Sequence, residues 1–489
     1  MRIVKFALFS FLLLFSISAT AQITSLTLED ALGIAMQNSP DIQRSRLNLE
    51  RSRQSLRAQQ AALKSRFSLS ITPYDYTSVR EFNTFYNTWN TNEISSSLGD
   101  FSVRQPIKWT DGTLMLTDRL EWQNSFSEFK NERSKSYSNN LYLSYNQPIF
   151  TYNKTRLDLR ELELDFENTA LSFALQQLSL EYQITLGFYN VYKNKMSYQI
   201  SQEEYNNQEQ SYQIIKNKVD AGLSAKEELY QAELNLATSK STMQNALVTL
   251  ESSMDEFKRQ TGIDIMKEID VVADVSHQPV PVEMEKALAT GQKNRMELRQ
   301  RNIDIENAYA DLTRTKAQNE FKGDVNLTYG IIGTNERYQD MYDQSTKNQK
   351  VSVSFEIPLF DWGERKARIK AAEATLKNQQ LSQSNQSNDI IIGIRQAIRD
   401  LQNQEVQIEI ERQNVRNAEL TYQINLEKYK NGDLTSMDLN LVQTQLSDRK
   451  TSYINSLISY KLALLNLKIE SMWDFVKNEP VVPDLSDIN

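Results

Sequence analysis

Two very long segments with a seven-residue apolar repeat constrain this chain more than any other feature of its sequence. They run from about 151 to 219 and from about 361 to 430, and each is followed by a Gly turn and a shorter segment of the same kind. In the last segment the repeat comprises Leu439, Val442, Leu446, Tyr453, Leu457, Tyr460, Leu464 and Leu467. This spacing keeps one seam of a helix against a partner helix. A helix of roughly 70 residues spans on the order of 100 Å, so we expect long packed helices.

The order of predicted elements occurs twice along the chain. Each copy begins with a short amphipathic helix, near 27–38 and near 283–294, and continues through a longer helix, strands, a very long helix, a Gly turn and a return helix. A Pro-rich stretch separates the copies. We therefore divide the chain into a first repeat at 22–274, a joint at 275–282, a second repeat at 283–470 and a C-terminal tail at 471–489.

The first 21 residues have the pattern of a secretory signal peptide. Arg2 and Lys5 precede an apolar run at 6–17, and the small residues at 19–21 supply a cleavage site. The run is shorter than the roughly 20 residues that a membrane-spanning helix needs. We expect 1–21 to be removed and the mature chain to begin at Gln22.

The composition excludes most catalytic and metal sites. The chain has no Cys and one His, so the usual zinc sites and Cys–His pairs cannot be built. His277 lies in the Pro-rich joint at 275–282, where the neighbouring residues do not resemble a catalytic triad. No Gly-rich phosphate loop occurs among the 13 Gly. The formal charge is −8, and it becomes −10 when Arg2 and Lys5 are lost, which argues against nucleic acid as a partner. We predict no enzyme and no cofactor, metal or catalytic site.

Strand patterns lie between the helices of each repeat. Apolar and small polar residues alternate at 67–72 and 141–146 in the first repeat, within a strand region of about 67–148. In the second repeat they alternate in strands at about 325–332 and 351–358. Alternation edged by aromatic residues is typical of outer-membrane barrel strands. We expect the polar segments at about 75–97 and 333–350 to be external loops, and the aromatic residues of 83–89 to form either a girdle at the lipid surface or a packed loop.

Two prolines mark the predicted transitions from strand to helix. Pro148 and Pro358 each end the last strand of a repeat, just before a very long helix. Proline cannot donate a hydrogen bond to a strand ladder, so it suits the end of a strand.

The strand count predicts an oligomer. Four strands in one chain cannot close a membrane barrel, and open sheet edges are not tolerated in lipid. Three copies would supply about 12 strands. One segment, at 98–124, complicates this count, because it looks like an extra hairpin around Asp111-Gly112 and its residues 105–107 repeat the Gln-Pro-Ile of 147–149. It is either an accessory on the outer loop or two more membrane strands; Asp118 and Arg119 favour the accessory slightly, since charge on a lipid face is costly.

From about Leu26 to Glu470 the sequence resembles the TolC family of outer-membrane efflux proteins. The resemblance is carried by 28–32 with 38–40, by 294–295 with 297–299, by 358–365 with 371–374, and by the Gly turns at 221–223 and 431–432. It implies a mainly α-helical chain with a membrane β region. As a homotrimer, such chains form a β-barrel of about 12 strands that continues into a long α-helical periplasmic barrel.

The same resemblance implies a function and a location. The protein would be the passive outer-membrane channel of a tripartite efflux or type I secretion system in a Gram-negative cell, with most of its mass in the periplasm. Its partners would be a periplasmic adaptor, an inner-membrane pump acting through that adaptor, and outer-membrane lipid. The alternative that the helices leave open is a structural or adhesive coiled-coil surface protein with no conducting lumen.

Within this family resemblance, the Gly turns are the predicted adaptor-docking tips, at Gly222, Leu223 and Gly432. Glycine tolerates φ > 0 at a helix end, although a plain helix–helix turn favours it as well.

The predicted periplasmic gate comprises Glu227, Glu228, Tyr429 and Asp438. Leu434 and Leu441 stand where the family carries Arg and a second Asp, so its closing network cannot be copied whole. In a trimer the acidic residues would recur as rings that favour cations. An ordinary helix start, where acidic residues suit the helix dipole, explains them equally well.

Overall fold

The structure is a computed structural model that describes residues 24–481, and it divides into two compact units. Within the described residues, unit 1 comprises 24–48, 170–298 and 385–481, and unit 2 comprises 49–169 and 299–384. Each unit draws on both sequence repeats, so the repeats are not separate spatial bodies. The predicted signal peptide at 1–21 and the end of the predicted tail, 482–489, lie outside the described residues.

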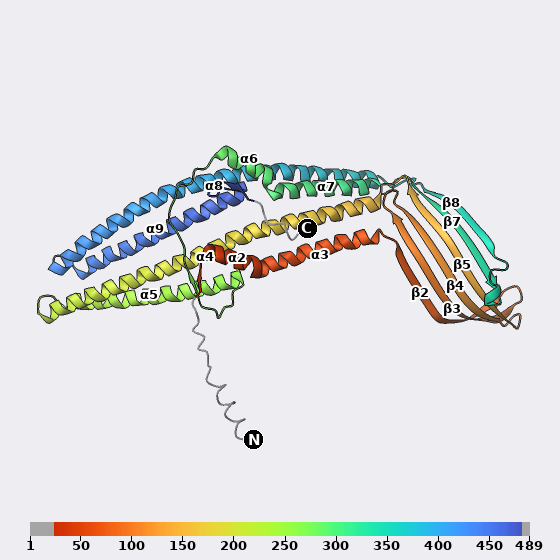
Figure 1. Ribbon diagram of the computed structural model, residues 1–489, viewed down its shortest axis with the longest axis horizontal. Coiled ribbons are helices and arrows are strands. Elements are labelled where there is room, and N and C mark those ends of the chain that lie inside the picture. Colours follow the sequence, from red (N-terminus) through yellow and green to blue (C-terminus); the bar gives the residue numbers. More distant parts are fainter. Residues whose placement is uncertain (1–23, 482–489) are drawn as a thin grey trace, which may run out of the picture. The chain divides into compact units, whose positions relative to one another are not determined.

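The helices follow the same order in both halves (Figure 1). The first half contains α2 (Leu28–Asn38), α3 (Pro40–Ala62), α4 (Lys154–Asp220) and α5 (Lys226–Thr261), and the second contains α6 (Met284–Asn294), α7 (Met296–Lys316), α8 (Glu364–Asn431) and α9 (Ser436–Ser471). A capping box between Thr27 and Asp30 begins α2, which satisfies the backbone N–H groups of its first turn. Among the described residues, no helix combines the length and the apolar composition that a membrane span needs.

The core of unit 1 follows the predicted heptad seams. On α9, Leu457, Tyr460 and Leu467 are buried against Ile390, Ile394 and Ile398 of α8, and Ala287 of α6 joins the same cluster. The short strands β1 (Thr24–Leu26) and β6 (Ile269–Val271) pair in parallel. Two further short strands, β9 (Trp473–Asp474) and β10 (Glu479–Pro480), pair after α9. The joint at 275–282 has neither helix nor strand.

Arginines link the helices within unit 2. Arg299 binds Glu167 through two hydrogen bonds of 2.6 and 2.8 Å, and it also bonds Glu306 at 3.1 Å. Arg314 likewise binds Asp158 and Glu161. Bidentate guanidinium–carboxylate pairs fix orientation as well as distance. These pairs are partly exposed, so we expect them to align the helices and to contribute little to the free energy of unfolding.

Unit 2 also contains one six-stranded antiparallel sheet, with the strands in the order β2-β3-β4-β5-β7-β8 (Figure 1). Their bounds are β2 Arg66–Asn83, β3 Thr88–Ile107, β4 Gly112–Ser127, β5 Glu132–Ile149, β7 Lys322–Asn335 and β8 Thr346–Glu356. The count of four strands per chain, which underlies the expected barrel of about 12, is therefore wrong. The expected loop at 75–97 is wrong as well, because β2 and β3 fill most of it and leave only 84–87 as a turn. Strands β7 and β8 likewise take up part of the expected loop at 333–350.

The strand register sorts the side chains of this sheet onto two chemically different faces. One face carries large exposed apolar side chains from every strand: Phe67, Leu69, Ile71, Phe101, Leu114, Leu116, Leu120, Leu141, Leu143, Leu327, Tyr329, Val351, Val353 and Phe355. The other face carries mainly polar residues, such as Ser102, Arg119, Asn140, Ser144 and Asn326. Membrane barrel strands show this division, because one face meets lipid and the other meets water.

The segment at 98–124 belongs to the sheet, so the preference for an outer-loop accessory is wrong. Its two charged residues are both accommodated. Arg119 lies on the polar face and binds Asp100 of β3 through Nε and Nη2 at 2.8 and 3.0 Å. Asp118 lies on the apolar face, where Asn139 of β5 donates a hydrogen bond to its Oδ1 at 2.7 Å. Pairing across neighbouring strands reduces the cost of charge in the sheet, and sequence spacing alone does not reveal it.

The predicted transition prolines lie close to the strand ends. Pro148 occupies the penultimate position of β5, and Pro358 follows β8 by two residues. Non-glycine residues with positive φ come next, Phe150 at 57° and Trp362 at 55°. The chain therefore turns sharply before α4 and before α8 begin.

Candidate functional site

Unit 1 contains two helix hairpins whose tips have the same backbone geometry. Gly222 and Gly432 have φ of 74° and 89°, in the left-handed region. The residue after each glycine donates its N–H back to the ending helix, Leu223 to Lys218 O at 2.8 Å and Asp433 to Lys428 O at 2.9 Å. Both turns are Schellman-type C-caps, which explains the glycine at each tip.

The two tips differ in the side chain that this shared turn projects. Leu223 is 79% exposed. The matching residue of the second hairpin is Asp433, which is also exposed and forms no ion pair among the described residues. One tip is therefore apolar and the other acidic, on the same backbone scaffold.

Next to the two turns, a cluster of buried apolar side chains and hydrogen bonds joins the two hairpins. Tyr429 is only 1% exposed and packs with Ile215, Ala232 and Leu439. Its hydroxyl donates to Ser211 O at 3.3 Å. Lys218 Nζ donates to Tyr429 O at 2.9 Å and lies 5.5 Å from the ring centroid. Burial raises the pKa of the Tyr429 hydroxyl, so this donor stays protonated across the neutral range.

Comparison with known proteins finds a family match for part of this chain. Residues 289–468 match the family model described as outer membrane efflux protein. The matched segment therefore has the sequence pattern of an outer membrane efflux protein. The match covers most of the second repeat, from within α6 to near the end of α9. In a search of curated proteins, no sequence matches this chain.

Solved structures of outer membrane proteins share the fold of this chain. The Campylobacter jejuni CmeC channel aligns with a TM-score of 0.70 at 15% identity, over 94% of this chain and 88% of that one. The outer membrane protein VceC of Vibrio cholerae aligns at 0.67 and 12% identity, over 93% and 97%. The open-state MtrE channel of Neisseria gonorrhoeae aligns at 0.66 and 12% identity, over 94% and 90%. At these identities the likeness establishes the fold.

Three of the four predicted gate residues have partners within this chain. Tyr429 is buried, as described above. Asp438 lies beside the N-cap Thr435 at the start of α9: its backbone N–H donates to Thr435 Oγ1 at 3.1 Å, and Thr435 Oγ1 donates to Asp438 Oδ2 at 2.7 Å. Glu228 accepts a hydrogen bond from the backbone N–H of Ser436, at 3.2 Å. Glu227 is exposed in the first turn of α5. The structure brings Glu228 and Tyr429 to one cluster, and the acidic ring stays a prediction.

Sequence reasoning missed a set of amide contacts between the hairpins. Gln208 Nε2 donates to Asn440 Oδ1 at 2.7 Å, and Asn207 Nδ2 donates to Gln443 Oε1 at 3.3 Å. Gln208 and Gln443 are buried. Buried amides that bond one another fix the register of neighbouring helices. The only sequence signal was the Gln- and Asn-rich composition of these helices, which does not identify partners.

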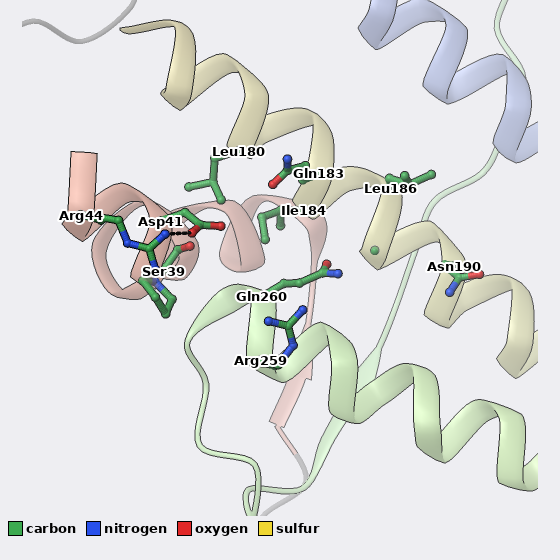
Figure 2. A pocket seen from close by; sticks show the side chains of 12 residues that line it. Ser39, Asp41, Arg44, Leu180, Gln183, Ile184, Leu186, Asn190, Arg259 and Gln260 are labelled. Carbon is green, nitrogen blue, oxygen red and sulfur yellow. Dashed lines mark hydrogen bonds and ion pairs between the residues drawn. The ribbon is translucent and has the colours of Figure 1, made fainter. Parts of the chain in front are cut away.

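A pocket of about 550 Å³ lies elsewhere in unit 1, between the α2–α3 corner, α4 and α5 (Figure 2). Its charged side chains already have partners: Arg44 binds Asp41 at 3.4 Å and Arg259 binds Glu256. The buried Gln260 Oε1 has no hydrogen-bond partner among the described residues. The side chains that line this pocket include no nucleophile–base pair.

His277 lies in the connector between the repeats, where its ring packs edge-on against Tyr460 with centroids 4.8 Å apart. The Tyr460 hydroxyl donates to the backbone at Gln278 O, at 2.9 Å. Within 24–481, no three His, Asp or Glu side chains group as a metal site would require.

Proposed function

We propose that this protein is the outer-membrane channel of a tripartite efflux or type I secretion system. It conducts substrate passively from a periplasmic adaptor and an inner-membrane pump to the exterior. The observation that carries this proposal is the six-stranded sheet, in which every strand exposes apolar side chains on one face. A soluble protein rarely exposes an apolar surface of this extent, and lipid is the solvent that suits it.

We propose that the edges of that sheet pair between three copies. Strands β2 and β8 are the outermost members and pair on one side only within the described chain. Unpaired backbone groups are not tolerated in the hydrocarbon core, so the edges must meet those of other copies. In the proposed homotrimer, β2 of one copy pairs with β8 of the next, and three sheets close one barrel in the outer membrane.

The helix hairpins supply the periplasmic end of the proposed channel, and their tips dock the adaptor. Apart from the adjoining residues, Lys218 Nζ is the one atom of the described chain within 4.0 Å of a Cβ placed at Gly222 or Gly432, so both turns have open surroundings. We propose that the adaptor contacts Leu223 with an apolar surface and Asp433 with a basic side chain. An adaptor surface that was complementary to only one of the two tips would lose the favourable contact at the other.

The gate is proposed at the same end, with Glu227, Glu228, Tyr429 and Asp438 recurring in each copy. Because Glu228 and Asp438 already hold helix starts within the chain, Glu227 is the acidic residue with most freedom to face the lumen. In this proposal the pump supplies the energy and the channel only opens and closes.

Reconstitution in planar bilayers tests the proposal. The purified full-length protein should run as a heat-labile trimer and should conduct ions after insertion. In cells that lack the protein, export should return when its gene is supplied. A monomer that produces no conductance in bilayers would contradict the proposal and would favour a non-conducting coiled-coil surface protein.

A further inference from the structure

The hairpin β3–β4 extends the sheet beyond the strands that we expected, and its ends repeat those of its neighbours. In β3, Gln105 Nε2 donates to Leu63 O at 3.0 Å and to Pro106 O at 2.7 Å. In β5, Gln147 Nε2 donates to Thr110 O at 2.6 Å and to Pro148 O at 2.7 Å. Leu63 lies just before β2, which pairs with β3, and Thr110 lies just before β4, which pairs with β5. In both copies of the Gln-Pro-Ile motif, the glutamine therefore bonds the start of the neighbouring strand and the carbonyl of its own proline.

These matching ends indicate two hairpins of one design in series, β2–β3 and β4–β5. Their strands have similar lengths, 18 and 20 residues in the first and 16 and 18 in the second. The first hairpin is followed by a short turn that returns the chain to the sheet, and the second is followed by helix α4. A duplicated hairpin adds two strands without changing the direction of the strand that enters α4.

The turn between β3 and β4 is fixed at the helical end of the sheet. Asp111 accepts hydrogen bonds from the backbone N–H groups of Lys154 and Thr155, at 3.2 and 3.0 Å, and so caps the start of α4. Asn153 Nδ2 donates to Lys108 O at 2.8 Å and to Trp109 O at 3.0 Å. The hairpin therefore reaches the level at which strand gives way to helix.

Aromatic side chains mark this same level. Trp109 in the turn is 89% exposed. Phe150, Phe360 and Trp362, which are also exposed, follow the ends of β5 and β8. Exposed aromatic residues at strand ends are typical of the interface between lipid and water. The far ends of the strands carry a second group, in which the Phe82 and Trp89 rings lie 5.2 Å apart and those of Tyr86 and Phe129 4.7 Å apart.

We infer that β3–β4 is a second membrane hairpin that forms part of the channel wall and widens the exit of the proposed channel. The apolar face of the sheet continues through it at Phe101, Leu114, Leu116 and Leu120, while Arg119 and Asp100 pair on the polar face. This inference rests on the proposed trimeric barrel. The diameter of a barrel grows roughly linearly with its strand number, so six strands per chain in place of four widen it about 1.5-fold and enlarge its cross-section about twofold. The exit then admits cargo that is too wide for a barrel of four strands per chain.

A deletion tests the width directly. Removing 84–127 leaves the turn at 128–131 to join β2 to β5, which run antiparallel and have 18 residues each. The full-length trimer and the deletion variant are compared in planar bilayers, with polyethylene glycols of graded size added on the loop side of the sheet. We expect the full-length channel to admit polymers with about 1.5-fold larger radius. Equal size limits would overturn the inference.

A second measurement uses the complete chain and does not depend on the folding of the deletion variant. Because the protein has no Cys, single substitutions give unique labels. Phe101→Cys and Ser102→Cys are neighbours on β3 that lie on opposite faces. We expect a fluorophore at position 101 to be quenched by quenchers carried on lipid chains, and a thiol at position 102 to react with a membrane-impermeant maleimide. If both positions react with the aqueous reagent and neither is quenched by lipid, the hairpin lies outside the bilayer and the inference fails. Failure of the complete chain to form a trimer or to conduct would instead overturn the proposed function.

Discussion

Glu228 of one hairpin accepts the backbone N–H of Ser436, the first residue of the return helix in the other hairpin, at 3.2 Å. The two repeats differ locally in a way that makes this contact possible. In α9 the N-cap Thr435 bonds Asp438, whereas α5 begins after Ala225, whose side chain cannot accept a hydrogen bond. Glu228 occupies the place of Asp438 but has no capping partner of its own. It is therefore free to bond the other hairpin.

Replacement of Glu228 by Ala should loosen the contact between the two hairpins. The Ser436 N–H would lose its acceptor, and a hydrogen bond to a charged group contributes about 1.5–3 kcal/mol, with the lower end expected at this half-buried site. Hydrogen exchange at the start of α9 should become faster, and Tm should fall. Glu227→Ala is the matched control, since Glu227 is exposed on the same helical turn. Equal effects of the two variants would show that the Glu228–Ser436 contact contributes nothing.

Alkaline pH should destabilise unit 1. Burial raises the pKa of the Tyr189, Tyr422, Tyr429 and Tyr460 hydroxyls above the ordinary value of 10.0. Above about pH 10 the unfolded chain therefore loses protons that the folded chain retains, so the free energy of unfolding falls as pH rises. Below pH 10 both states keep these protons and the effect vanishes. Thermal unfolding followed from pH 8 to 11, together with near-ultraviolet tyrosinate absorbance, measures both changes. A Tyr429→Phe variant should show a shallower loss of Tm with pH.

The tip glycines should not tolerate side chains, even though space is available. Gly222 has φ of 74°, and a Cβ placed on it would meet nothing within 4 Å in the described chain beyond the adjoining residues, so backbone strain alone opposes alanine there. We expect Gly222→Ala to cost about 1 kcal/mol locally and to reduce export, with a larger loss for Gly222→Val. Gly33→Ala is the control, because Gly33 lies in α2 with equally open surroundings and without a positive φ. That variant should be neutral or slightly stabilising. Normal export by Gly222→Val would contradict the docking role of this tip.

Asp111 should matter for the start of α4 although it lies more than 40 residues earlier in the sequence. Asp111→Ala would leave the N–H groups of Lys154 and Thr155 without this acceptor, and loss of an N-cap costs about 0.5–2 kcal/mol. We expect a lower Tm and faster hydrogen exchange in the first turn of α4. Asp324→Ala provides a comparison, since the Asp324 side chain lies in the same sheet without capping a helix. An unchanged Tm for Asp111→Ala would mean that solvent replaces the cap.

The sequence predicted the elements whose pattern is local and missed those that depend on pairing. Heptad spacing placed Leu439, Leu457 and Tyr460 correctly in the helix seams, because helical periodicity depends only on neighbours in sequence. The place of β3–β4 in the sheet was obscured by Asp118 and Arg119, whose partners Asn139 and Asp100 lie on adjacent strands. Contacts such as Glu228 with Ser436 join residues more than 200 positions apart, and no periodic pattern encodes them.

The two tips should make chemically distinct contributions to adaptor binding. Leu223 and Asp433 occupy the same position of the same turn, one apolar and the other acidic. Leu223→Ala should weaken binding to the same extent at low and high salt, because burial of apolar surface depends little on ionic screening. Asp433→Asn should weaken binding mainly at low salt and should flatten its salt dependence, because it removes a charge that attracts a basic partner. Titration of the trimer with its purified adaptor at two ionic strengths distinguishes the two effects. If Asp433→Asn leaves both the affinity and its salt dependence unchanged, the second tip does not use its carboxylate, and docking there must rest on the backbone of the Gly432 turn.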